Sequence, residues 1–163
     1  MPRPPLGSGD LFMGRYRLDA ELFSNLPGAW RFRATDKILA RQIDVYLLTG
    51  PRTEDAIDAA RRAALLDDPR VARIIDAGSY SGTSFVLTEA LEGVSLADVG
   101  PLHAAQARAV AGEVASALAA AARVDVHHLS LSPELVFLGQ GNSVKVSGMA
   151  WDAALRGIAD LDP

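Results

Sequence analysis

Hydrophobic and polar positions alternate with a period of two through most of the first half of the chain, the spacing of half-buried β-strands. In residues 43–48 this alternation places Ile43 on one face and both Asp44 and Tyr46 on the other. Turns rich in Gly, Pro and Asn separate the alternating segments. Strands are predicted over residues 15–18, 29–34, 43–48, 72–76 and 83–89.

One helix interrupts these strands. Thr53 begins it, an acidic first turn follows, and Asp68-Pro69 ends the segment. Apolar residues recur at helical spacing and predict the buried stripe Ile57, Ala60, Ala64 and Leu65.

After residue 93 the period changes to that of helices. A short helical turn is predicted over 96–99 and a long helix over 104–123, followed by a hairpin of strands at 136–138 and 144–146. The expected buried stripe of the long helix is Ala107, Val110, Ala111, Val114, Leu118 and Ala121.

Composition narrows the possible functions. The chain has 163 residues, 49% of them hydrophobic, which is enough for a sizeable core. Its 16 basic and 20 acidic residues give a net charge of −4 without a basic face, so no nucleic-acid partner is expected. There is no cysteine, which excludes disulfides and thiolate catalysis. No run reaches the ~18 apolar residues of a membrane span, so a cytoplasmic location is expected.

Several short motifs follow one another in a fixed order. They are Gly14-Arg15-Tyr16-Arg17-Leu18, the segment 68–78 that starts Asp-Pro-Arg-Val, Phe85-Val86-Leu87-Thr88-Glu89, and Gly93-Val94-Ser95-Leu96. Their order and spacing resemble the bacterial serine/threonine protein kinases. The resemblance implies an α+β protein kinase-like fold, with a five-stranded antiparallel N-lobe, helix C and a truncated, mainly helical C-lobe. Residues 1–11 would be a flexible leader, 12–92 the N-lobe and hinge with gatekeeper Thr88, and 93–163 the incomplete C-lobe.

The same resemblance locates the first catalytic positions. Phosphoryl transfer by kinases needs a lysine held by a glutamate. The strand motif V-A-I-K matches residues 43–46, so the lysine position holds Tyr46. Counting back from Asp68-Pro69, the helix-C glutamate position falls at Ala59. The glycine-rich loop matches residues 23–29, which have one glycine and a proline that cannot donate an N–H.

The catalytic loop H-R-D-x-K-P-x-N matches residues 128–135. The base position holds Ser130, the lysine position Ser132 and the metal-binding asparagine position Leu135, while Gly148 stands where D-F-G begins. No carboxylate is left at these positions for Mg²⁺. The resemblance therefore predicts a pseudokinase that is no enzyme, without metal or cofactor.

The roof over adenine supports the same prediction. In kinases a valine and an alanine form it, and here those positions are Arg31 and Asp44. We expect these two to pair, Tyr46 to occupy the space of the lysine stem, and the filled cleft to exclude ATP.

Alternatives remain beside this interpretation. Arg31 and Arg33 would replace the missing lysine in an unconventional ATP-binding transferase. The pair His127-His128 suggests a ligand or a base, but no Cys or carboxylate has ligand spacing with it, so a structural histidine is expected. Asp152 is either a displaced metal ligand or, as we expect, a solvated loop residue. Lys145 is expected to point outward.

Among pseudokinases the chain is most similar to the cytoplasmic kinase-like domain of actinobacterial MviN/MurJ-type lipid II flippases. The Arg-Tyr-Arg-Leu start, the Asp-Pro-Arg-Val turn and Leu155-Arg156-Gly157-Ile158 carry this resemblance. It implies a regulatory protein-binding role in the export of peptidoglycan precursors. The implied partners are a forkhead-associated domain protein and an active Ser/Thr kinase. We expect a fragment of a longer protein, tethered to the inner face of the cell membrane by parts outside this chain.

Overall fold

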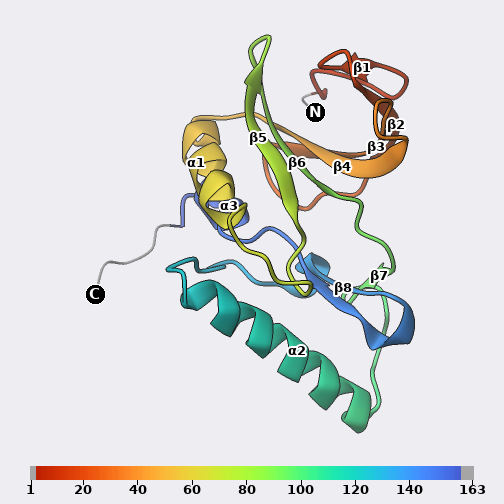
Figure 1. Cartoon of the computed structure of the whole chain (residues 1–163), viewed down its shortest axis with the longest axis vertical. Helices are drawn as coiled ribbons and strands as arrows, with labels where there is room; N and C mark the ends of the chain where they lie inside the picture. The colour runs from red at the N-terminus through yellow and green to blue at the C-terminus, as the bar shows by residue number, and fades with distance from the viewer. Residues whose placement is uncertain (1–2, 159–163) are drawn as a thin grey trace.

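The computed structural model describes residues 3–158 and shows two lobes joined by the segment after Glu89 (Figure 1). The first lobe is a curled antiparallel sheet with the strand order β1-β2-β3-β4-β6-β5. The kinase-like α+β architecture predicted from the sequence is confirmed. The strands are β1 Leu11–Phe12, β2 Tyr16–Leu22, β3 Ala29–Asp36, β4 Arg41–Leu48, β5 Ile74–Tyr80 and β6 Thr83–Glu89.

The sheet has one strand more than predicted. β1 is only two residues long, too short for its alternation to show in the sequence. It is held by Phe12, whose buried ring meets those of Tyr80 and Phe85 edge to face at centroid distances of 5.9 and 5.4 Å. Just before it, the Gly9 N–H donates to the Leu18 carbonyl at 2.7 Å. Residues near the end of the expected leader are thus tied to β2.

The hairpin of β5 and β6 is longer than predicted. The sequence indicated a turn over residues 78–82, but β5 continues to Tyr80 and the reversal is made by Ser81 and Gly82. Both turn residues have positive φ, 49° and 78°. This matches the two-residue turns that suit the right-handed twist of paired strands.

Helix α1, Thr53–Ala63, lies against β5, β6 and the last helix. Its buried face is almost entirely alanine, which lets the helix approach the sheet closely. The predicted stripe was wrong at Ala64 and Leu65: the helix ends before them, and Leu65 is 85% exposed. The buried residues are Ala56, Ile57, Ala59, Ala60 and Ala63.

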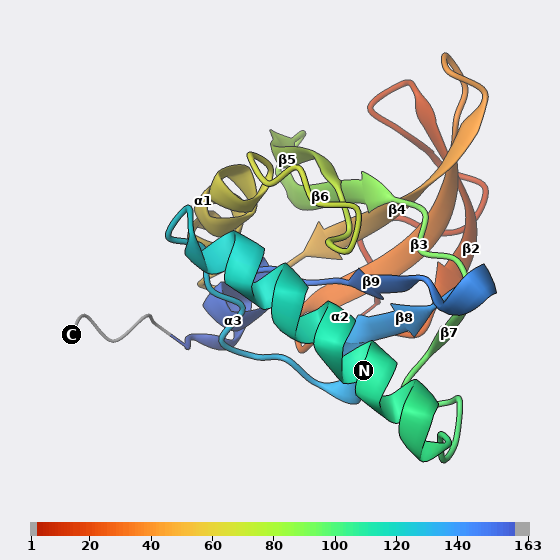
Figure 2. The same cartoon turned by 60° about the horizontal axis from the view of Figure 1, so that its bottom comes forward.

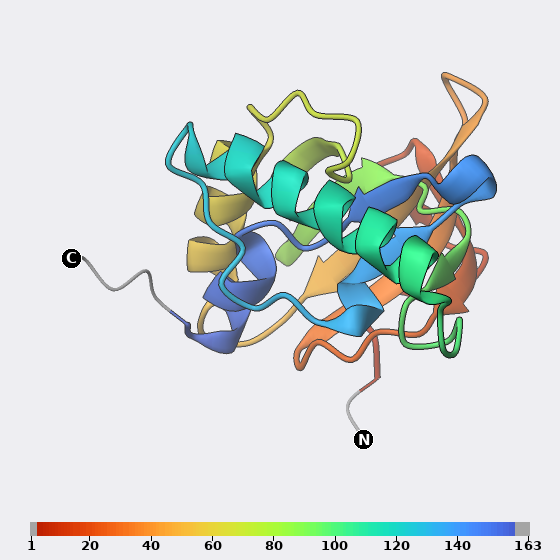
Figure 3. The ribbon, with the colours of Figure 1, turned by 90° about the horizontal axis from the view of Figure 1, so that it is seen from below.

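The second lobe combines a small sheet with helices. In Figures 2 and 3 the long helix α2 crosses in front of strands β8 and β9, and the short helix α3 lies near α1. The sheet order is β7-β8-β9. The elements are β7 Val94–Ser95, α2 Ala104–Ala122, η1 Pro133–Leu135, β8 Val136–Leu138, η2 Gln140–Asn142, β9 Val144–Val146 and α3 Trp151–Arg156.

Helix α2 buries less of itself than predicted. Within the described residues only Val110, Ala117 and Ala121 of this helix are buried, whereas Ala107 and Ala111 are exposed. The rest of the expected stripe, apart from the buried Ala121, lines one side of an open apolar groove of about 520 Å³. The reason is that α2 packs mainly on β9 and meets little else along its length.

The two lobes also meet away from the hinge. Val71 forms a parallel bridge with Val146 of β9, and the Ala72 N–H donates to the Val146 carbonyl at 2.8 Å. Lys145 pairs with Glu89 at 2.8 Å instead of pointing free into solvent. Among the residues described, no helix is both long and apolar enough to cross a membrane.

Candidate functional site

A cleft of about 570 Å³ lies between the lobes. Its walls include Phe23 from the β2–β3 loop, Tyr46 from β4, and Leu135 and Phe137 from the second lobe. It is the place where the kinase resemblance puts the nucleotide. The side chains that fill its roof and floor therefore decide what it can bind.

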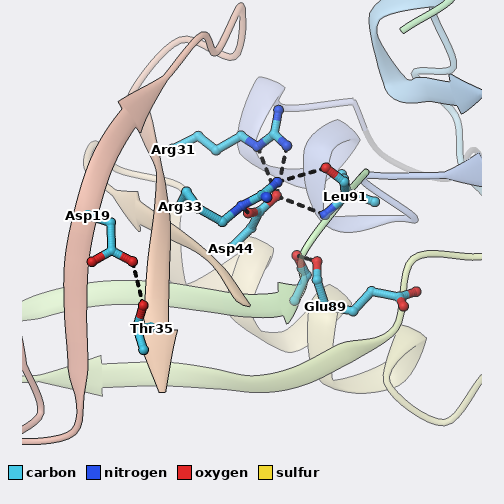
Figure 4. A network of polar contacts seen from close by, with 8 residues as sticks. Asp19, Arg31, Arg33, Thr35, Asp44, Glu89 and Leu91 are labelled. Carbon is cyan, nitrogen blue, oxygen red and sulfur yellow. Dashed lines mark hydrogen bonds and ion pairs between the residues drawn. The ribbon is translucent and has the colours of Figure 1, made fainter. Parts of the chain in front are cut away.

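The roof is organised around Asp44. This carboxylate is completely buried, and it accepts hydrogen bonds from Arg31 at 2.7 and 3.2 Å and from Arg33 at 2.6 Å. It also accepts a hydrogen bond from the backbone N–H of Leu91 at 3.2 Å. Figure 4 shows both guanidinium groups converging on this one carboxylate beside the hinge. A buried charge is stable only when paired in this way.

Other polar groups of the hinge residues also form hydrogen bonds within the protein. Arg33 donates to the carbonyl oxygen of Leu91 at 2.7 Å, so both backbone groups of Leu91 are taken by side chains of β3 and β4. The buried hydroxyl of Thr88 donates to the carbonyl of Glu89 at 2.9 Å. The sequence did not predict the part played by Leu91. Its only indication was that Arg31 and Arg33 lie on the same face of β3, so that both can reach Asp44 and the hinge.

Arg31 lies between two aromatic rings. Its guanidinium carbon is 6.0 Å from the centroid of Tyr46 and 5.3 Å from that of Phe137, within the range of cation–π attraction. Burial alone would lower the pKa of Arg31, but the neighbouring Tyr46 and Asp44 raise it above its usual range. The side chain is a permanent cation in the cleft wall.

Tyr46 occupies the inner end of the cleft. Its ring packs on Trp151 of α3 with centroids 4.8 Å apart. Burial raises the pKa of the Tyr46 hydroxyl, so this group stays neutral. Ala59 of α1 is buried in the same hydrophobic core. The positions that the resemblance assigns to the lysine and the glutamate are thus an aromatic ring and a methyl group, both buried in one hydrophobic core.

The floor is built on Asp152. The Ser130 hydroxyl donates to Asp152 Oδ1 at 2.7 Å, and Arg156 donates to the same oxygen at 2.8 Å. The expectation of a solvated loop residue was wrong, because Asp152 is 1% exposed in the first turn of α3. Its i,i+4 spacing to Arg156 was the signal in the sequence that pointed to a paired carboxylate.

The remaining predicted positions lie beside this pair. Gly148 has φ of 75°, and a Cβ there would come within 3.0 Å of Asp152 and 3.5 Å of Leu135. Ser132 lines the α2 groove and is not among the residues that line the cleft. Leu135 lines the cleft wall. The structure therefore groups Ser130, Leu135 and Gly148 and leaves Ser132 outside.

The histidine pair has a structural role. His128 is buried, and its Nε2 lies 2.7 Å from the Ser147 carbonyl oxygen. Burial lowers the pKa of His128, so the ring is neutral near pH 7. His127 lies 3.4 Å from Asp125. Within residues 3–158, no three side chains of the metal-binding types are placed to hold an ion.

A magnesium nucleotide does not fit these residues. The backbone groups of Leu91 are already bonded, and the Asp152 carboxylate is held by Ser130 and Arg156. The positions that the resemblance assigns to the kinase metal ligands hold Leu135 and Gly148, which have no ligand atoms in their side chains.

Comparisons with known proteins support the fold. No protein-family model matches the chain. It is 26% identical over 147 residues to the probable serine/threonine-protein kinase pknA2 of Bifidobacterium longum, covering 82% of the chain and 19% of that protein. It is 27% identical over 134 residues to the serine/threonine-protein kinase PrkC of Bacillus subtilis, covering 76% of the chain and 21% of that protein. The chain thus spans about a fifth of these relatives.

Solved structures agree. The PknI kinase domain of Mycobacterium tuberculosis superimposes with a TM-score of 0.77 at 20% identity, over 96% of this chain and 71% of that domain. Its C20A mutant gives a TM-score of 0.78. The chain therefore has a bacterial Ser/Thr protein kinase-like fold.

These comparisons correct one expectation. The sequence predicted a protein that is no enzyme, yet both curated relatives are named serine/threonine kinases and the matching structures are kinase domains. The prediction that the chain is no enzyme is therefore wrong. The replaced side chains are those of this chain, and at 26–27% identity both relatives differ from it at most aligned positions.

Proposed function

We propose that this chain is a kinase-like regulatory module that acts by binding a protein partner. The buried cluster of Arg31, Arg33 and Asp44 supports the proposal, because these side chains occupy the cleft roof and hold it in one shape. The pair of Tyr46 and Trp151 joins the two lobes on the other side of the cleft. Such a pre-organised body suits recognition, since little ordering entropy is lost on binding.

The partners follow from the resemblance to the MviN/MurJ-type domains. We propose an active Ser/Thr kinase that phosphorylates this chain and a forkhead-associated domain that then binds it. The module would thereby regulate export of peptidoglycan precursors at the inner face of the membrane. Thr49 is exposed and Thr53 is half-buried at the start of α1, whereas Thr88 is only 2% exposed. A phosphate on Thr53 would be stabilised by the helix N-terminus.

A capture experiment tests this role. The chain is incubated with an active bacterial Ser/Thr kinase and Mg-ATP, and a forkhead-associated domain on beads is used for capture. We expect capture only after phosphorylation, and its loss in the Thr49→Ala/Thr53→Ala double variant. Thr88→Val is the matched control and should retain capture. Equal capture with and without phosphorylation, or none in either case, contradicts the proposed partners.

Protein phosphorylation is the second candidate, because both curated relatives are named serine/threonine kinases. The same preparation with labelled ATP and a general protein substrate tests it. Transfer that is lost in Asp152→Asn and kept in Asp125→Asn would establish this activity, since Asp152 is the buried carboxylate at the cleft floor and Asp125 is exposed. Absence of transfer by the purified chain would remove the candidate.

A further inference from the structure

The backbone N–H and carbonyl of the hinge residue Leu91 both form hydrogen bonds to side chains of the protein. Asp44 accepts from the Leu91 N–H at 3.2 Å, and Arg33 donates to the Leu91 carbonyl at 2.7 Å. A planar base recognised by a peptide edge needs both a free donor and a free acceptor there. In this structure Leu91 offers its pair to two side chains of the sheet (Figure 4).

We propose that Asp44 is a clamp that closes the hinge to purine bases and that its removal opens the cleft to them. The clamp lies in the same cleft as the proposed binding module, but its action does not depend on a protein partner. Asp44 and Arg33 are then the residues that decide which ligands reach Leu91.

The clamp is stable because the buried carboxylate accepts hydrogen bonds from two arginines and from the Leu91 N–H, so the cluster of Asp44, Arg31 and Arg33 has a net charge of +1. Asp44 is 0% exposed, while the side chains of Arg31 and Arg33 are 12% and 21% exposed. A base that accepted the hydrogen bond of the Leu91 N–H would remove one of the donors to the buried Asp44 carboxylate. Losing a donor to a buried acceptor costs free energy, so the Leu91 N–H binds Asp44 in preference to the base.

The cleft behind the clamp is not completely filled by side chains. About 570 Å³ remains between the lobes, lined partly by Phe23, Phe137 and Trp151. Flat apolar side chains of this kind suit a ring system. The hydrogen bonds at Leu91 and the charges of Asp44, Arg31 and Arg33 therefore exclude the base. The volume of the cleft does not.

The double variant Arg31→Val/Asp44→Ala tests the clamp. It removes one positive and one negative charge, restores the small apolar side chains that kinases carry in the roof, and frees the Leu91 N–H. Adenosine is the probe, because without phosphates it cannot bind merely through an unpaired arginine. We expect about tenfold tighter adenosine binding than in the unaltered chain, the value of the one hydrogen bond regained at the Leu91 N–H, because Arg33 still donates to the Leu91 carbonyl in this variant. Calorimetry measures the affinity, and the NMR shift of the Leu91 amide locates the ligand.

Asp19→Ala is the matched control. Asp19 bonds to Arg17 and Thr35 on the sheet rather than to Leu91, so this variant should bind adenosine no better than the unaltered chain. Saturable adenosine binding by the unaltered chain that shifts the Leu91 amide overturns the clamp. So does a folded double variant that fails to bind.

If the double variant does not fold, hydrogen exchange of the unaltered chain decides. Slow exchange of the Leu91 amide supports the clamp, and exchange as fast as that of an exposed loop amide refutes it. Neither result affects the capture experiment above, so failure of the clamp and failure of the proposed partners are distinguishable.

Discussion

The ring of Tyr46 meets the ring of Trp151 edge to face, with centroids 4.8 Å apart, and this contact joins strand β4 to helix α3 across the cleft. Both residues are almost fully buried, at 6% and 2% exposure. Where the resemblance places a lysine held by a glutamate, the chain has a buried aromatic pair. The cleft is consequently held by packing from one side and by the Asp44 hydrogen bonds from the other.

Tyr46→Ala tests how much this pair contributes. Removing a buried aromatic ring loses its transfer free energy and leaves a cavity, so we expect the free energy of unfolding to fall by about 3–5 kcal/mol. Urea unfolding measures the change. Phe23→Ala is the control, since Phe23 is 78% exposed and its loss should change stability by less than about 0.5 kcal/mol. Similar losses in the two variants would show that the pair is not a structural contact.

The turn between α1 and β5 gives a prediction about pH. Hydrogen bonds from Arg70 lower the pKa of Asp68 from 3.8 to about 2. Because the folded pKa lies below the unfolded one, the contribution is complete above pH ~4 and is lost as the pH falls towards 2. We expect Asp68→Asn to cost about 1 kcal/mol at pH 7 and only a small part of that near pH 2, where Asp68 is half protonated in the folded state. Denaturant titrations across this range measure it, with Asp67→Asn as the control for charge; a cost that is the same at pH 7 and pH 2 contradicts the assignment.

Two glycines should respond in opposite directions to alanine. Gly93, after the hinge, has φ of 90°, and a Cβ there would overlap the Leu138 carbonyl of β8. We expect Gly93→Ala to lose at least about 1–3 kcal/mol, the range for backbone strain alone. Gly112 lies in α2, where an added methyl group would have no neighbouring atom within 4 Å, so Gly112→Ala should gain about 0.5–1 kcal/mol. Thermal unfolding of both variants checks the signs, and a destabilised Gly112→Ala would mean that α2 is not helical there.

Local pattern predicted much of this fold, because a period of two is visible in the strands of the first lobe, even though β4 is buried on both faces from Ile43 to Leu48. The faces of Asp44 and Tyr46 follow from that period alone. What the pattern could not show was the partner of each side chain. Leu91 contributes only backbone atoms to the cluster, and backbone atoms leave no trace in residue identity.

The exposure of isolated polar residues was harder to predict. Asp152 follows a loop in the sequence, yet it is buried because Ser130, distant along the chain, donates to it. Burial of such a residue depends on tertiary contacts, which local propensity does not contain. For the same reason the predicted stripe of α2 overestimated its burial, since the amphipathic pattern does not say which face meets a neighbour.

Ser130→Asp provides the last prediction and tests the floor of the cleft. It places a carboxylate where kinases have their base, but here the Ser130 hydroxyl already donates to Asp152 at 2.7 Å. Two carboxylates about 4 Å apart repel each other by ~4 kcal/mol at an effective dielectric constant of about 20, before compensation by Arg156. We therefore expect the variant to be destabilised at pH 7 relative to Ser130→Asn, which has similar size and no charge.

The pH dependence of this variant identifies the cause. A close carboxylate pair binds one proton more tightly in the folded state than in the unfolded chain, so the stability of Ser130→Asp should rise relative to Ser130→Asn as the pH falls from 7 to 5. Urea unfolding at the two pH values measures this difference. If the two variants have equal stability at pH 7, Asp152 does not face Ser130 as a charged acceptor. If they differ equally at both pH values, the cost is steric, and the electrostatic description of the floor is wrong.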